Sequence, residues 1–191
     1  MLLSNKLSLV RVFFAPIFFI AYSAAERFSE YKMLILICLT ALLVFVEFTD
    51  FLDGYIARKF NQVSDTGKLL DPFSDAFLHI NMFFCFTVTR TMPAFIFALI
   101  FYREFLMLFL RMLSIKKGAA VAARMGGKLK TVLYIITGFC ALIMEIADGA
   151  GFIAAALRLK TVLTILFYLC AVASYISFAD YLIQFRKLTR G

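Results

Sequence analysis

The sequence predicts an all-α integral membrane protein, a bundle of six transmembrane helices with both termini in the cytoplasm. The composition is 63% hydrophobic and 17% aromatic, with 24 Phe and no Trp, which is unusual for a soluble domain. Only 12 of the 191 residues are acidic, and six long apolar stretches fill most of the chain. Because a membrane helix needs about 20 apolar residues, six such helices account for nearly the whole length.

The six expected helices follow one another with short connections. They cover roughly 7–25, 33–51, 73–89, 93–113, 130–147 and 161–183. The third is expected to begin at Asp71-Pro72, because aspartate is favoured as a helix N-cap and proline at the first helical position. We expect a single membrane-embedded domain over residues 1–191.

The distribution of Lys and Arg predicts the orientation, because positively charged loops stay in the cytoplasm. With the N-terminus inside, thirteen basic residues lie inside and five outside. The five are Arg27, Lys32, Arg90, Arg158 and Lys160. The net charge is +8, and the basic residues flank apolar helices. This arrangement favours contact with anionic lipid headgroups and not with nucleic acid. The expected location is the bacterial cytoplasmic membrane, with the polar site facing the cytoplasm.

Four aspartates, Asp50, Asp53, Asp71 and Asp75, stand between two of the apolar stretches. Asp50 and Asp53 share a helix face, and Asp75 follows Asp71 by one turn. If the two helices are neighbours, four carboxylates converge near the cytoplasmic surface. Converging carboxylates repel one another, and a hard divalent cation relieves the repulsion, which favours Mg²⁺ or Mn²⁺. The lone histidine, His79, is expected to be packed or hydrogen-bonded and not a ligand.

Small and basic residues accompany the aspartates. Gly54 and Ala57 allow a close approach on one helix flank, as Gly67 does further on. Arg58 offers a fixed positive charge to a phosphate oxygen. The alternative is that Gly54 and Ala57 only pack helices and that Arg58 only obeys the positive-inside rule.

The pattern Asp50-x-x-Asp53-Gly54-x-x-Ala57-Arg58, eight further residues, then Gly67-x-x-x-Asp71-x-x-x-Asp75 resembles the signature of the CDP-alcohol phosphotransferase family. The signature covers 26 residues, and the six-helix layout resembles the family throughout. The resemblance implies transfer of a phosphatidyl group from CDP-diacylglycerol to an alcohol, with release of CMP. It implies that Asp50, Asp53 and Asp71 hold metal and that Asp75 contacts the metal site and acts as the base. It also implies that Gly54, Arg58 and Ser64 line the CDP site, with Ala57 and Gly67 giving room.

Flanking residues resemble the bacterial phosphatidylglycerophosphate synthase branch of that family. The similar segments are Asn5-Lys6-Leu7-Ser8-Leu9-Val10-Arg11, Arg103-Glu104-Phe105, Arg111 and Gly126-Gly127-Lys128-Leu129-Lys130-Thr131. The implied acceptor is glycerol 3-phosphate, whose phosphate would meet Arg103, Arg111, Lys128 and Lys130. The alternative is that Arg103 pairs with Glu104 or Glu47 and that the lysines reach the membrane interface.

Ala76 departs from that branch, which commonly has lysine after the last aspartate. The departure leaves inositol phosphate, inositol, serine and phosphatidylglycerol open as acceptors. A cation-binding transporter is a distant alternative, although the aspartates lie at a helix end and the sequence has no visible repeat. Related enzymes are commonly dimeric, and we expect Phe83, Phe84 and Phe86 to face either a second copy or lipid.

Overall fold

The computed structural model describes residues 3–59, 65–116 and 125–190, with side chains for 8–49, 67, 69–116 and 126–187. This part of the chain forms six α-helices and no strand, which confirms the predicted all-α class. The helices are α1 (Leu3–Arg27), α2 (Lys32–Lys59), α3 (Asp65–Val88), α4 (Ala94–Lys116), α5 (Met125–Gly149) and α6 (Ile153–Arg190). Four of the six predicted apolar stretches lie within one longer helix, while 73–89 extends one residue past the end of α3 and 93–113 begins one residue before α4.

The expected start of the third helix is wrong. α3 begins at Asp65, so Pro72 lies inside the helix and Asp71 is not its N-cap. Proline lacks an N–H, which removes the hydrogen bond to the carbonyl of residue 68, but the surrounding helix continues past it. The N-cap preference of Asp-Pro is a local property, and here the packing of α3 along α1 outweighs it.

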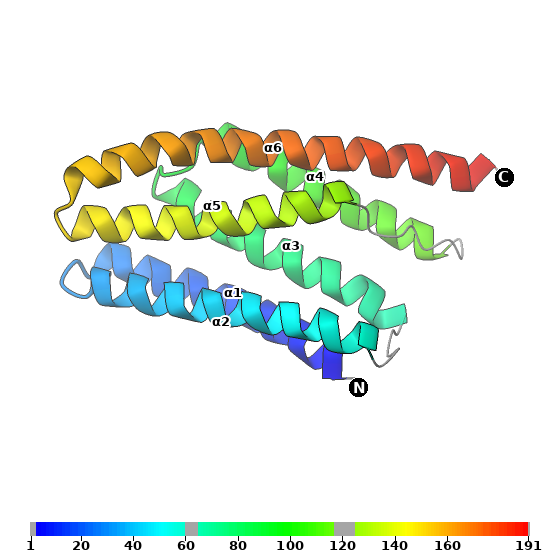
Figure 1. The fold of residues 1–191 in the computed structure, drawn as a ribbon, viewed down its shortest axis with the longest axis horizontal. Helices are drawn as coiled ribbons and strands as arrows, with labels where there is room; N and C mark the ends of the chain where they lie inside the picture. Colours follow the sequence, from blue (N-terminus) through cyan, green and yellow to red (C-terminus); the bar gives the residue numbers. More distant parts are fainter. Residues whose placement is uncertain (1–2, 60–64, 117–124, 191) are drawn as a thin grey trace.

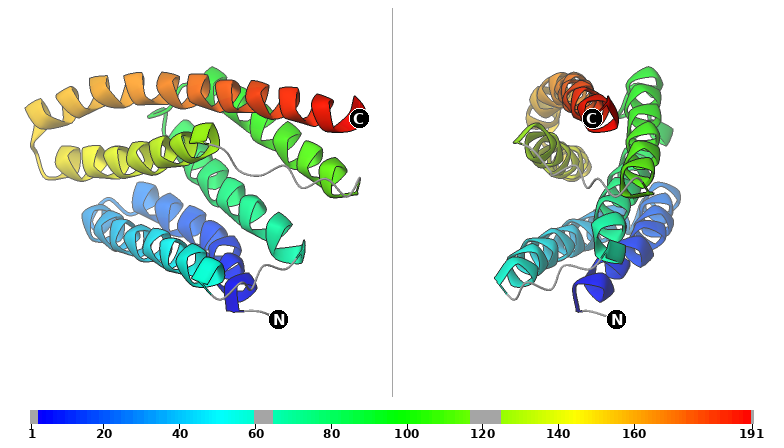
Figure 2. Two further views of the ribbon diagram at one scale, coloured as in Figure 1. Left: turned by 45° about the vertical axis from the view of Figure 1, so that its right-hand side comes forward. Right: turned by 90° about the vertical axis from the view of Figure 1, so that its right-hand side faces the viewer.

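The helices run alternately up and down the bundle. α1 and α2 lie side by side, and so do α5 and α6 (Figure 1). α3 lies between these two pairs and packs on α1 and α5. α4 packs on α3 and α6, on the side away from α2 (Figure 2). The start of α1, the end of α2, the start of α3 and the end of α6 lie at the same end of the bundle (Figure 1). This end is called the terminal end below.

One stripe of each helix faces the core. On α1 the buried residues Phe14, Phe18 and Tyr22 recur every four positions, the spacing of one helix face. Many large apolar side chains point outward instead, including Phe13 and Ile20 of α1, which are 67% and 66% exposed. Outward apolar surface on this scale is suited to lipid and not to water.

The expected outward face of the third helix is partly wrong. Phe83 and Phe86 are fully buried, and of the three phenylalanines only Phe84 faces outward, with 42% exposure. Phe83 packs edge-on against Tyr134 and Phe167, and Phe86 packs edge-on against Tyr22. Positions three apart share a helix face, so Phe83 and Phe86 turn inward together.

Four of the helices, α1, α2, α5 and α6, contain segments long and apolar enough to cross a membrane. These segments are Ser8–Arg27, Lys32–Thr49, Gly126–Gly149 and Ile153–Lys187. α3 and α4 have comparable lengths of 24 and 23 residues but contain charged side chains. The four apolar helices indicate a membrane protein.

Candidate active site

Arg11 of α1 brings Asp71 and Asp75 of α3 together at the terminal end. The Arg11 side chain is only 4% exposed, and its Nη2 lies 3.1 Å from Asp71 Oδ1. Its Nη1 donates to Asp75 Oδ1, and Ser8 Oγ, one turn earlier on α1, donates to Asp71 Oδ1. The side chains of Asp71 and Asp75 are 55% and 34% exposed, so both acids remain accessible. The site is thus a pair of accessible carboxylates backed by a buried guanidinium.

The remaining aspartates of the signature lie on α2. Asp50 and Asp53 belong to its last turns, as do Gly54, Ala57 and Arg58, but their side chains lie outside the described part of the structure. Ser64 also lies outside the described residues, and Gly67 is half-buried near the start of α3. Convergence of all four carboxylates therefore stays a prediction. Within the described residues, no group of three or more His, Cys, Asp or Glu side chains is placed to hold a metal.

His79 lies one turn beyond Asp75 and links α3 to α2. Its Nδ1 is 2.8 Å from the backbone oxygen of Asp75, and its Nε2 is 3.5 Å from Glu47 Oε1. The side chains of His79 and Glu47 are 5% and 16% exposed. The expectation that this histidine is hydrogen-bonded is confirmed.

A second polar cluster joins α4, α5 and α6 around one carboxylate oxygen. Oε1 of Glu104 accepts hydrogen bonds from Arg103 Nη1 at 2.8 Å, Lys130 Nζ at 2.8 Å and Tyr134 OH at 3.0 Å. Arg103 Nε also donates to the backbone oxygen of Ser174 on α6, at 2.8 Å. Two cations around one carboxylate leave the cluster with a net positive charge.

The four cations predicted for the acceptor phosphate lie in different surroundings. Arg103 is 2% exposed and bound to Glu104, so it fits the alternative role of a structural ion pair, though with Glu104 and not Glu47. Lys130 has a 13% exposed side chain, with Nζ 4.7 Å from the centre of the Tyr134 ring. Arg111 is half-buried on α4, and Lys128 is exposed in the first turns of α5. Of the four, Lys130 and Arg111 are partly buried, whereas Arg103 is fully buried and Lys128 is exposed.

The carboxylates and the cationic cluster adjoin one another. Asp75 interacts electrostatically with both Lys130 and Arg111. The His79 ring packs edge-on against the Tyr134 ring, with centroids 5.7 Å apart. The carboxylates of α3 therefore lie beside cationic side chains of α4 and α5.

Sequence reasoning missed several of these residues. The sequence places Arg11 among the basic residues on the inside and in a segment that resembles the family branch, but not in the site, although a charged side chain inside an apolar helix usually has a partner. Ser8, Tyr134 and the Glu47–His79 contact were not predicted as parts of the site. The signal for Glu47 was an acid within an apolar stretch, three residues before Asp50.

Comparisons with known proteins agree on the family. Residues 1–172 match the CDP-alcohol phosphatidyltransferase family. A CDP-diacylglycerol–glycerol-3-phosphate 3-phosphatidyltransferase of Treponema pallidum is 47% identical over 94 residues, which are 49% of this chain and 44% of that protein. The same enzyme of Bacillus subtilis is 34% identical over 140 residues, covering 70% of this chain and 72% of that protein.

A more distant relative aligns over a greater length. A probable phosphatidylglycerophosphate synthase of Mycobacterium tuberculosis is 25% identical over 181 residues, covering 82% of each chain. In the Treponema alignment, by contrast, this chain spans less than half of the relative's length.

Removal of the Glu104 carboxylate should destabilise the fold strongly. Glu104→Ala leaves Arg103 and Lys130 buried without their shared acceptor, for which we expect a loss of about 3–5 kcal/mol in unfolding free energy. Thermal unfolding in detergent measures this. The matched control is Glu26→Ala, which removes an exposed pair with Lys32 and should cost about 0–1 kcal/mol. Equal losses in the two variants would contradict the assigned role of Glu104.

Proposed function

The chain belongs to the CDP-alcohol phosphatidyltransferase family, and we propose that it transfers the phosphatidyl group of CDP-diacylglycerol to glycerol 3-phosphate, releasing CMP. The main support is the pairing of accessible acids on α3 with adjoining cations on α4 and α5. A hydroxyl nucleophile needs a base, and a phosphorylated acceptor needs fixed positive charge. The printed names of the Treponema and Bacillus relatives support the same donor and acceptor.

The residues present fit a divalent cation. Asp71 and Asp75 offer oxygen donors on one helix face, already gathered by Arg11, and oxygen donors suit Mg²⁺ or Mn²⁺. In the proposal Asp50, Asp53 and Asp71 hold the metal, and Asp75 contacts it. When bound, the cation neutralises charge on the pyrophosphate and on the departing CMP.

Asp75 is the proposed general base. It takes the proton of the acceptor hydroxyl while that oxygen attacks the phosphorus attached to diacylglycerol. A new phosphorus–oxygen bond forms to the acceptor, and the bond from the same phosphorus to the CMP oxygen breaks. Arg11 fixes the orientation of the Asp75 carboxylate through Nη1.

Lys130 and Arg111 are the proposed contacts of the acceptor phosphate. Arg103 supports Lys130 through their shared partner Glu104, and Lys128 lies at the proposed entrance. Gly54, Arg58 and Ser64 are the proposed CDP contacts, and Ala57 and Gly67 give the nucleotide room. Ala76 is buried, with 4% exposure, and brings no cation beside Asp75. The cations that would favour an acceptor with a phosphate therefore come from α4 and α5.

We place the protein in the bacterial cytoplasmic membrane as one domain of six spanning helices, with the site and both termini facing the cytoplasm. The start of α1 and the end of α6 lie at the same end of the bundle (Figure 1), and Ser8 and Arg11 belong to the first half of α1. The outward apolar side chains suit membrane lipid, and the dimer expected from the family resemblance would use part of that surface.

A panel assay tests the proposal. Purified protein receives CDP-diacylglycerol, Mg²⁺ or Mn²⁺, and one acceptor at a time: glycerol 3-phosphate, inositol phosphate, inositol, serine or phosphatidylglycerol. We expect CMP release chiefly with glycerol 3-phosphate. Release with another acceptor would correct the substrate, and no release with any of them would overturn the enzyme assignment and leave the transporter alternative.

Asp75→Asn should abolish most transfer while the protein remains folded. The amide cannot accept the proton, so we expect the rate of CMP release to fall by about 10²–10⁴-fold. Asp148→Asn is the matched control, since Asp148 is exposed near the end of α5. A near wild-type rate in Asp75→Asn, with an unchanged melting temperature, would exclude this residue as the base.

Arg111→Ala should weaken the acceptor more than the lipid donor. Loss of one fixed cation facing a phosphate should raise KM for glycerol 3-phosphate by about tenfold or more, with KM for CDP-diacylglycerol little changed. Arg158→Ala, at an exposed position of α6, serves as the control. An unchanged acceptor KM would remove Arg111 from the site.

A further inference from the structure

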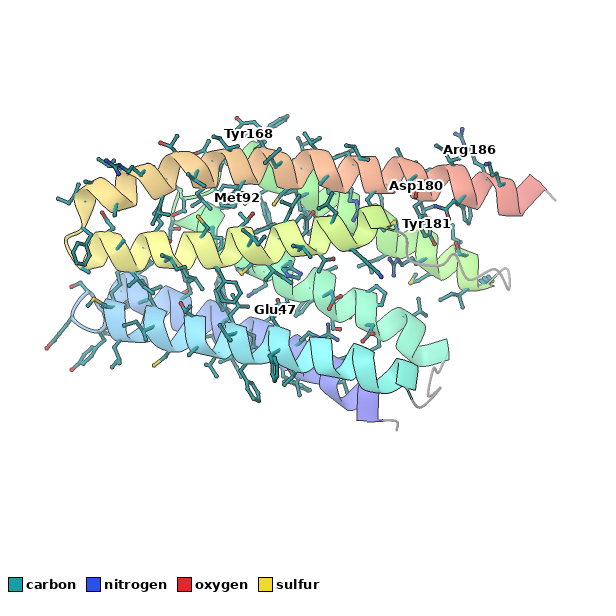
Figure 3. The ribbon with its side chains drawn as sticks, viewed as in Figure 1. Glu47, Met92, Tyr168, Asp180, Tyr181 and Arg186 are labelled. Atoms are coloured by element: carbon teal, nitrogen blue, oxygen red, sulfur yellow. The ribbon has the colours of Figure 1, made fainter. Side chains whose placement is uncertain are left out.

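Glu47 and His79 make a polar contact between two helices whose backbones do not touch. In the described part of the chain α2 packs on α1 and α5, and α3 packs on α1, α4 and α5, but α2 and α3 have no direct backbone contact. Glu47 Oε1 and His79 Nε2 approach to 3.5 Å across this separation. Glu47 is labelled on α2 in Figure 3. This contact is therefore suited to fix the distance between α2 and α3.

The contact lies one helical turn below the aspartates on both helices. Glu47 precedes Asp50 by three residues, and His79 follows Asp75 by four. Residues three or four apart share a helix face, and one turn advances about 5.4 Å. Asp50 therefore lies one helical turn along α2 from the residue that meets His79. Whatever sets the spacing of the two backbones at Glu47 and His79 also affects their spacing one turn further along, at Asp50 and Asp75.

The imidazole ring is fixed from three directions. A backbone oxygen can only accept, so His79 Nδ1 donates its proton to the oxygen of Asp75, 2.8 Å away. The edge contact with Tyr134 holds the ring plane, and Nε2 is left facing Glu47. Nε2 makes no hydrogen bond within the described residues, and Glu47 Oε1 approaches it to 3.5 Å.

We propose that Glu47 and His79 form a positioning pair, which holds the carboxylates of α2 and α3 at the separation that a divalent cation requires. The proposal rests on the proposed function, because it takes Asp50, Asp53, Asp71 and Asp75 as the metal-binding acids. Neither residue of the pair touches the reacting atoms. Their effect passes through the backbone of Asp75 and the helix turn that ends at Asp50.

Binding of Mn²⁺ without any lipid substrate tests the pair directly. Free Mn²⁺ is measured by electron paramagnetic resonance against protein in detergent, for wild type, Glu47→Ala, His79→Ala and the double variant. Each single substitution should raise the Kd for Mn²⁺ by about 10–100-fold, as loss of groups that orient metal ligands does. The Kd of the double variant for Mn²⁺ should not exceed the higher Kd of the two single variants, because the two residues act as one unit.

Thr87→Val is the matched control. Thr87 Oγ1 donates to the backbone oxygen of Phe83 at 2.8 Å, a bond within α3 like that of His79 to Asp75, and no described contact joins this hydroxyl to another helix. Its Mn²⁺ affinity should equal that of wild type. If an alanine variant does not fold, Glu47→Gln keeps the side-chain shape without the charge, and the same rise in Kd is expected.

Kinetics provide a second measurement. In the Glu47 and His79 variants kcat should fall, while KM for glycerol 3-phosphate stays within about twofold of wild type. Unchanged Mn²⁺ affinity with only a lower melting temperature would overturn the pair, as would single effects that multiply in the double variant. A wild-type protein that releases CMP alongside such variants leaves the proposed function intact, whereas a wild type that binds no Mn²⁺ overturns both proposals.

Discussion

The ion pairs from Arg11 to Asp71 and Asp75 are the interaction on which the site depends. A buried guanidinium without partners would cost several kcal/mol, and two neighbouring carboxylates without a cation would repel each other. The guanidinium of Arg11 neutralises the two carboxylates, and the carboxylates in turn provide the buried guanidinium with partners. These ion pairs fix the position of α1 along α3. Because both acids keep part of their surface exposed, the same pairing leaves oxygen atoms available to a ligand.

The second cluster extends this arrangement across the bundle. Glu104 gathers Arg103, Lys130 and Tyr134 on a single oxygen, which immobilises side chains from α4 and α5 that would otherwise have many conformations. The Tyr134 ring then contacts His79, one turn from Asp75. The proposed base and the proposed phosphate contacts are therefore connected through packed and hydrogen-bonded side chains. Chemistry between a donor and an acceptor requires this fixed relation.

The helices were predictable because apolar length is a local property of the sequence, and all six were found. Their inward faces were not, since α3 is mostly apolar after Ala76, and periodicity alone does not separate Phe84 from Phe83. The start of α3 was misjudged for a similar reason: Asp71-Pro72 has N-cap chemistry, but the helix begins earlier. The acids proposed to bind metal could be named from their spacing. Arg11, the partner of Asp71 and Asp75, is about 60 residues away in the chain, and no local sequence pattern predicts such a contact.

The opposite end of the bundle carries a different kind of polar cluster. There the buried Glu145 of α5 accepts hydrogen bonds from the hydroxyl groups of Tyr22 on α1 and Thr91, which follows α3. Tyr22 OH also lies 3.2 Å from Thr89 Oγ1. These partners are neutral, and Glu145 is only 7% exposed, so the cluster ties three segments together without presenting charge to a ligand. At the terminal end the acids face cations and stay accessible. The two ends thus differ inside the bundle: the buried acid at the opposite end has hydroxyl groups as its hydrogen-bond partners, whereas the acids of α3 at the terminal end are paired with a buried guanidinium.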